Sequence, residues 1–278
     1  MLFRSLLGIE TSGTVGSVAL LAGSRVLVRE IATPREQTEK ILALIDALLA
    51  AASTELAALD GIAFGRGPGS FTGLRVSTAV AQGLGSATGV PLIPVSSLLC
   101  LAESAWREQR CEHCLVCVDA HMGQVYWVES ARCDGIVQLV SPERLGAPAE
   151  VVAPTERGWA AVGSGFSPDG PGPELATVLA SAGPVLPSLQ ASAQDLFPAA
   201  LRELAAAIMR DLAPFHPYLT GQVLSGTAGR QTGIDLVMFT DDAKALELLL
   251  LSRDIVFKTG EKRTNIGDLV RKIGRAHV

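Results

Sequence analysis

Residues 65–85, GRGPGSFTGLRVSTAVAQGLG, have the composition of a loop that could bind phosphate. A glycine-rich turn that leads into a helix presents free backbone amides to an anion, and Arg66 and Arg75 flank this turn. A P-loop also needs a lysine, in the pattern G-x-x-x-x-G-K-[ST], and no lysine lies near. Alternatively, the glycines only permit a sharp turn and close packing of the helix. The residues alone leave both interpretations open.

Two carboxylates, Glu10 and Asp119, stand where strands are expected to end. In actin-like ATPases, carboxylates at two such positions hold Mg²⁺–ATP. Thr11 and Ser12 are compatible with a phosphate turn after the first carboxylate, whereas His121-Met-Gly is poor in the glycine that a second turn needs. We therefore predict a degenerate nucleotide site. Its vestigial phosphate loops comprise Glu10, Thr11, Ser12, Gly67, Gly69 and Ser70.

Other chemistry is poorly supported. Cys111, Cys114 and Cys117 have the two-residue spacing with which zinc and iron–sulfur sites begin, but a second pair or a following Cys-Pro is missing. Cys117 also lies in an alternating apolar run, where a small apolar residue is expected. The chain has four histidines and neither a G-x-S-x-G elbow nor an H-x-x-x-H pair. We expect no catalytic residue and no metal ligand.

Composition restricts the class of protein. The net charge of −5 over 278 residues gives no basic face for binding nucleic acid unaided. Five cysteines, an odd number, without a secretory signal are typical of the reducing cytoplasm. Residues 76–102 lack charge, but their glycines and prolines favour a buried helix, a turn and a buried strand over a membrane span.

The elements that position these residues alternate between strands and helices. We predict strands at 2–10, 17–21, 25–32, 60–65 and 90–95, with helices at 34–52, 70–85 and 97–108. These elements form one α/β unit over residues 1–110. Strands near 115–119, 124–130, 136–140 and 160–163, and a helix at 191–212, form a second unit over 111–218.

The first two helices carry more apolar surface than one core contact requires. Ile41, Ile45 and Leu48 mark one face of the first helix, and Leu42 and Leu49 mark another. In the second helix, small residues recur every four positions and would let another helix approach closely. We predict a protein partner on this surface. The predicted interface residues are Leu42, Ile45, Leu49, Phe71, Gly73, Leu74, Ser77 and Ala81.

Residues 219–278 differ from the rest of the chain. Lys40 is the only lysine in the first 243 residues, whereas the last 35 contain four. Residues 272–278 can be encoded by a sequence that resembles a common sequencing adapter. We interpret 219–278 as an atypical tail that arises from a gene-model artefact, with a genuine extension as the alternative.

Four motifs resemble the TsaB (YeaZ) family: IETSGTVGSVAL at 9–20, the glycine loop at 65–85, PVSSL at 94–98 and DAHMGQVYW at 119–127. The resemblance covers residues 1–218. The sequence departs from the usual pattern of the family at Glu10, where Asp is usual, and at His121, where Arg is usual. Residues 35–38 read Arg-Glu-Gln-Thr, where the family often has Arg-Gln-His-Ser.

The resemblance implies an actin-like (ASKHA) α/β fold of two subdomains. It implies a heterodimer with a TsaD-like subunit through helices matching 36–52 and 70–86, with a TsaE-like ATPase docked on that pair. The TsaD-like subunit transfers threonylcarbamoyl to N6 of the adenosine beside the tRNA anticodon. This chain is therefore expected to interact with tRNA only indirectly, through the complex. This chain alone is then expected to bind no cofactor, with ATP and metal in the partner subunits.

Three other assignments of function or assembly remain open. The chain could form a homodimer, act as a self-sufficient actin-like ATPase or carbamoyltransferase, or be a peptidase, an old label for relatives of the family. Measurable ATP binding by the isolated chain would support the second, and labelling by an activity-based probe would be needed for the third.

Overall fold

The computed structural model describes residues 5–152, 154, 157–171, 183–220, 223, 234–238, 243–252, 257–263 and 269–275. A first sheet has the strand order β3-β2-β1-β4-β5. Its strands are β1 (Ser5–Glu10), β2 (Gly16–Ala22), β3 (Arg25–Ile31), β4 (Gly61–Gly65) and β5 (Leu92–Val95). The first three form an antiparallel meander, and β4 and β5 extend the sheet parallel to β1. This is sheet A.

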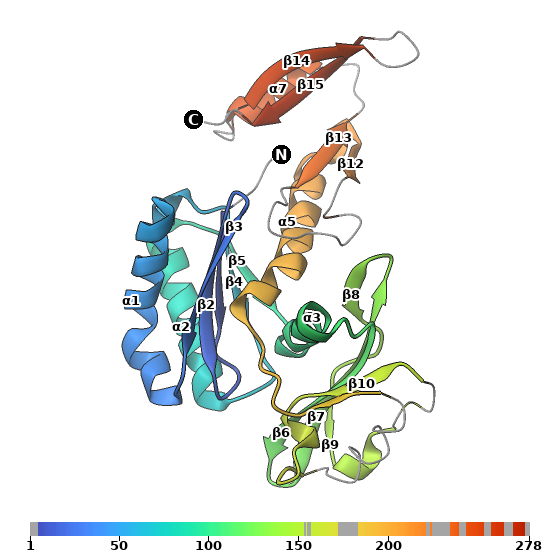
Figure 1. Ribbon diagram of the computed structural model, residues 1–278. Coiled ribbons are helices and arrows are strands. Elements are labelled where there is room, and N and C mark those ends of the chain that lie inside the picture. The colour runs from blue at the N-terminus through green and yellow to red at the C-terminus, as the bar shows by residue number, and fades with distance from the viewer. Residues whose placement is uncertain are drawn as a thin grey trace.

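Helices cover both faces of sheet A, which explains why every residue of β4 is buried. α1 (Pro34–Ala52) and α2 (Phe71–Thr88) pack on one face, and α5 (Phe197–Asp211) packs on the other, as Figure 1 shows. Alternation along β1 serves both layers, because Leu7 and Ile9 face the α1–α2 layer whereas Leu6 faces α5.

Local signals set the ends of these helices. The Thr33 hydroxyl accepts a hydrogen bond from the Glu36 amide at the start of α1. Ser70 caps α2 in the same way through the Gly73 amide. α2 continues past the predicted end at Gly85 and stops at Gly89, whose φ of 76° is the left-handed conformation that terminates helices.

A second sheet, sheet B, has the order β11-β10-β6-β7-β8, with β9 also paired to β7. Its strands are β6 (His113–His121), β7 (Gln124–Cys133), β8 (Ile136–Leu139), β9 (Arg144–Gly146), β10 (Trp159–Val162) and β11 (Val185–Leu186). Two short strands, β9 and β11, were not predicted from the sequence. α3 (Ser97–Gln109) packs on sheet B and lies between the two sheets (Figure 1).

The predicted helix at 191–212 divides into a 3₁₀ turn, η4 (Ala193–Leu196), and α5. The predicted boundaries assign this segment to the unit 111–218, but Ala193, Ala200 and Leu204 pack in the core of sheet A. The unit built on sheet A therefore combines the first part of the chain with η4 and α5.

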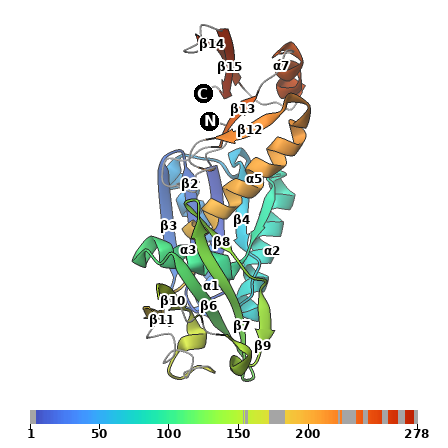
Figure 2. The ribbon, with the colours of Figure 1, turned by 90° about the vertical axis from the view of Figure 1, so that its right-hand side faces the viewer.

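Beyond α5 the chain forms β12 (Pro217–Thr220), β13 (Asp235–Met238), α7 (Ala243–Ser252), β14 (Phe257–Arg263) and β15 (Leu269–Arg275), which Figure 2 shows at one end of the molecule. Val223 and Ile234 are buried in the same core as α5. Leu246 and Leu250 of α7 pack with Leu212. The described part of the atypical tail therefore packs on the rest of the chain up to α7. Of residues 272–278, the last three lie outside the described residues.

Candidate functional site

A cleft of about 320 Å³ lies between the two sheets. It is bounded by the β1–β2 turn, the loop before α2, the N-terminal half of α3, the β6–β7 turn and the segment that leads to η4. The predicted residues Ser12, Gly69, Ser70, Asp119 and His121 all line it. Of the six residues predicted to form vestigial phosphate loops, Ser12, Gly69 and Ser70 therefore line this cavity, whereas Thr11 and Gly67 do not.

Glu10 does not line this cleft. Its side chain is fully buried, where one carboxylate oxygen accepts a hydrogen bond from the Ser12 amide at 2.7 Å and the other accepts one from the Ser97 hydroxyl at 3.1 Å. Burial raises the pKa of the Glu10 carboxyl, and these hydrogen bonds offset part of the rise. A Cβ at Gly65 would lie 2.2 Å from this carboxylate, so glycine is required there. The carboxylate is occupied by internal contacts.

Two amides at the start of α2, those of Ser70 and Gly73, are likewise occupied. The Ser70 amide donates to the Ser12 carbonyl at 2.8 Å, and the Gly73 amide donates to the Ser70 hydroxyl at 3.3 Å. A Cβ at Gly73 would lie 1.7 Å from the Thr11 carbonyl oxygen, while the Thr11 hydroxyl donates to the Gly73 carbonyl at 2.7 Å. These glycines let α2 pack directly against the β1–β2 turn, which favours the second of the two interpretations drawn from the sequence.

The opposite wall is the β6–β7 turn. One Asp119 carboxylate oxygen accepts a hydrogen bond from the His121 amide at 2.7 Å, and the Asp119 amide donates to the Ser164 hydroxyl at 3.1 Å. His121 and Met122 take positive φ angles of 65° and 52°. In the part of the chain that the structure describes, the residues that line the cleft include no lysine or arginine, so polyphosphate would meet a carboxylate without a balancing cation.

The three clustered cysteines do not converge. Cys114 packs in the core between sheet B and α3, whereas Cys117 packs in the core on the other face of the sheet. Residues three apart on a strand point to opposite faces, so these two thiols cannot share a metal ion. Burial raises the pKa of each to about 12. Among the described residues, no three His, Cys, Asp or Glu side chains are grouped as metal ligands would be.

The predicted partner interface needs correction. Ile45 and Leu49 are buried in the core beneath α1. The small residues of α2 (Gly73, Ser77 and Ala81) face the chain's own sheet, where the Ser77 hydroxyl donates to the Gly65 carbonyl at 3.1 Å. These five residues are not available to a partner.

The exposed part of the predicted interface is smaller. Leu42 is 54% exposed, Phe71 is 69% exposed, and Leu74 is partly buried. The Arg75 guanidinium lies 3.9 Å from the centre of the Phe71 ring. Leu42 and Phe71 offer apolar surface on the α1–α2 layer, and their role in binding stays a prediction.

Known proteins similar to this chain identify its family. A family model described as TsaD, tRNA N6-adenosine threonylcarbamoyltransferase, matches residues 29–171. The tRNA threonylcarbamoyladenosine biosynthesis protein TsaB of Escherichia coli K12 is 35% identical over 206 residues, which are 72% of this chain and 87% of that protein. The chain belongs to the TsaB family.

Other TsaB relatives support this assignment. TsaB of Haemophilus influenzae is 41% identical over 129 residues, which cover 46% of this chain and 54% of that protein. YeaZ from Pseudomonas aeruginosa has a TM-score of 0.65 at 34% identity, over 75% of this chain and 94% of that one. A second P. aeruginosa structure, described as similar to peptidase YEAZ, has the same TM-score at 33% identity, over 75% of this chain and 93% of that one. The predicted α/β fold of the actin-like class is confirmed.

The TsaB motifs could be recognised from the sequence, but the hydrogen bonds from Ser97 to Glu10 and from the Ser70 amide to Ser12 could not, because they join distant segments. Ser164 and Gln190, which also line the cleft, were missed, since neither belongs to a recognisable motif. Within the described residues no helix combines the length and apolar character needed to cross a bilayer.

Proposed function

We propose that this chain is a non-catalytic scaffold subunit of a tRNA threonylcarbamoyltransferase complex in the cytoplasm. It binds a TsaD-like subunit as a heterodimer, and a TsaE-like ATPase joins the pair. The TsaD-like subunit carries out N6-threonylcarbamoylation of the adenosine next to the anticodon, with ATP and metal held in the partner subunits. The names of the TsaB relatives support participation in this biosynthesis.

One observation carries the non-catalytic part of the proposal. Two of the groups that would bind a nucleotide, the Glu10 carboxylate and the Ser70 amide, make internal hydrogen bonds instead. None of the described residues that line the cleft is an arginine or lysine that could balance phosphate charge. The apolar side chains Leu42 and Phe71 remain exposed on the α1–α2 layer, and that layer supports the assignment of a binding role.

The alternative enzymatic functions have less support. A self-sufficient ATPase or carbamoyltransferase would need the cleft to bind Mg²⁺–ATP. A peptidase would need a nucleophile paired with a base, and among the described residues no Ser or Cys side chain donates a hydrogen bond to a histidine. The outcomes of the binding test below separate these functions.

The test is light scattering of the full chain, alone and mixed with a TsaD-like subunit, after size exclusion. We compare Leu42→Glu with Leu145→Glu, because the two leucines are similarly exposed, at 54% and 51%, but only Leu42 lies on α1. We expect Leu42→Glu to abolish the heterodimer and Leu145→Glu to leave it intact. Equal binding by both variants would refute the proposed interface. A chain that dimerises only with itself would favour the homodimer.

Calorimetric titration of the isolated chain with Mg²⁺–ATP tests the other half of the proposal. We expect no saturable binding. Tight binding that Asp119→Asn weakens would instead show that the cleft is a functioning nucleotide site, and the chain would then have to be treated as an enzyme.

A further inference from the structure

The main chain crosses between the units built on sheets A and B at only two described places. The first crossing runs from β5 through α3 to β6, and the second runs from β11 to η4, as seen beside α3 in Figure 1. Two adjacent crossings of this kind could act as a hinge, with the cleft opening and closing between the sheets. Side-chain contacts across the boundary therefore decide whether the two sheets move.

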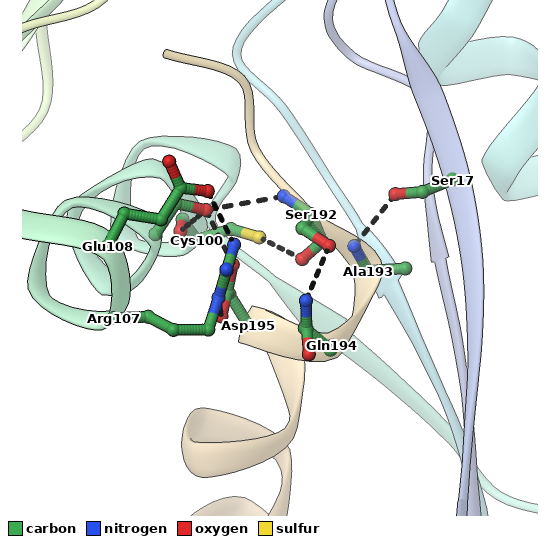
Figure 3. A network of polar contacts seen from close by, with 9 residues as sticks. Ser17, Cys100, Arg107, Glu108, Ser192, Ala193, Gln194 and Asp195 are labelled. Atoms are coloured by element: carbon green, nitrogen blue, oxygen red, sulfur yellow. Dashed lines mark hydrogen bonds and ion pairs between the residues drawn. The ribbon is translucent and has the colours of Figure 1, made fainter. Parts of the chain in front are cut away.

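The first such contact lies at the C-terminal end of α3. The Arg107 guanidinium donates two hydrogen bonds to the Asp195 carboxylate, at 2.8 and 3.0 Å, and the Ser104 hydroxyl donates a third at 2.6 Å. Asp195 is 5% exposed and belongs to η4, which packs on sheet A. α3 packs mainly on sheet B and also contributes Cys100 to the core of sheet A. Figure 3 shows Arg107 and Asp195 together with Ser192. The Ser192 amide donates to the Ser104 hydroxyl at 3.3 Å.

The same crossing segment is attached to sheet A itself. The Ala193 amide donates to the Ser17 hydroxyl of β2 at 2.9 Å, as Figure 3 also shows. A Cβ at Gly8 of β1 would lie 2.5 Å from the Ala193 carbonyl oxygen, so the segment is in direct contact with the sheet. The Arg107–Asp195 pair therefore connects α3 to a part of the chain that cannot move independently of sheet A.

The second contact lies at the N-terminal end of α3. Glu143, between β8 and β9 of sheet B, accepts a hydrogen bond from the Arg66 guanidinium at 3.1 Å. Its other carboxylate oxygen accepts a short hydrogen bond from the Ser96 hydroxyl. Arg66 and Ser96 directly follow β4 and β5, so this contact joins the end of sheet A to sheet B.

The two contacts lie far apart along the same helix. Ser96 and Arg107 are separated by a helical rise of about 16 Å. A rotation of one sheet against the other about an axis near either contact would displace the other contact. The Arg202 guanidinium of α5 also donates a hydrogen bond to the Val137 carbonyl of β8 at 3.2 Å. This contact is weaker than the other two, because it is a single hydrogen bond to a neutral acceptor.

We propose that the Arg107–Asp195–Ser104 group and the Arg66–Glu143–Ser96 group, one at each end of α3, lock sheets A and B at a single angle and hold the cleft at a fixed width. The chain then behaves as one rigid body, and its cleft does not widen to admit a larger ligand. This conformational lock is independent of which partner the α1–α2 layer binds.

The test measures the relative motion of the two sheets by residual dipolar couplings of backbone amides in the full chain. The release variant is Arg107→Met with Glu143→Ala, because both side chains are partly exposed and their removal leaves the cores intact. The matched control is Arg35→Met with Glu36→Ala, which removes the same residue types from exposed ion pairs within α1.

We expect couplings from sheets A and B of the natural chain and of the control to fit one alignment tensor of equal magnitude. In the release variant, the alignment tensor fitted to the amides of one sheet should be smaller than the tensor fitted to the amides of the other sheet. The couplings within each sheet should still fit the folded structure. Unequal magnitudes in the natural chain would overturn the proposal, as would equal magnitudes in the release variant.

Discussion

Glu103 is a buried acid whose titration should have a large effect on the stability of this protein. It lies on α3 and is 7% exposed. The pKa of its carboxyl is raised to about 8, mainly by burial; Arg202 of α5 and Arg132 of β7 oppose the rise, and Asp195 of η4 adds to it. The carboxyl is therefore protonated in the folded chain at neutral pH but ionised in the unfolded chain.

The sign of the pH dependence follows from this difference. Between the ordinary pKa of 4.5 and about 8, the folded state binds one proton more than the unfolded state. The free energy of unfolding therefore falls as pH rises through this interval. One pKa unit corresponds to about 1.4 kcal/mol, so the full loss attributable to Glu103 is about 5 kcal/mol. That loss is comparable with the whole stability of many domains.

The assay is urea unfolding of the natural chain and of Glu103→Gln from about pH 5 to about pH 9. Glutamine has the shape of the protonated acid and does not titrate, so any fixed cost of the amide shifts the curve without changing its slope. We expect the variant to gain stability relative to the natural chain by about 1.4 kcal/mol per pH unit until about pH 8. A difference that stays constant over this range would refute the assigned pKa.

Two further matched pairs test packing by chemical unfolding. Gly73→Ala should destabilise the chain by about 3 kcal/mol, because the new Cβ would clash with the Thr11 carbonyl. Gly83→Ala in the same helix should stabilise the chain by about 0.5–1 kcal/mol, because a Cβ there would have no atom within 4 Å. Similar effects of both changes would contradict the contact described for α2. Leu246→Ala should cost about 3 kcal/mol because Leu246 is 3% exposed, and Leu248→Ala, at 58% exposed, should cost less than about 0.5 kcal/mol. If neither change matters, α7 does not pack on α5 and the tail is dispensable.

Much of the fold could be predicted from local signals, since caps and alternation are encoded within a few residues. The direction in which a helix face points could not. The stripe of Gly73, Ser77 and Ala81 is suited equally to a partner helix and to the chain's own sheet. The deciding neighbour of Gly73 is Thr11, which is distant in sequence.

Leu49 illustrates a second limit. Leu42 and Leu49 are seven residues apart and share a helix face, yet one is 54% exposed and the other 8%. Leu49 packs in one core with Leu56 and Leu59, because the chain after α1 turns back over the end of that helix. Helical periodicity alone does not show which end of a face is covered by a later segment.

The arrangement of sheet A also has a consequence for synthesis on the ribosome. α1 and α2 follow their strands at once, whereas α5, which covers the other face, is made about 100 residues after β5. At the usual rate of translation, that face stays uncovered for roughly 5–20 s. Leu6, Ala19 and Leu21 would form an apolar surface on the nascent chain during this interval. Arrested chains that end before η4 should therefore crosslink to a ribosome-bound chaperone through that face, and chains long enough to expose α5 should not.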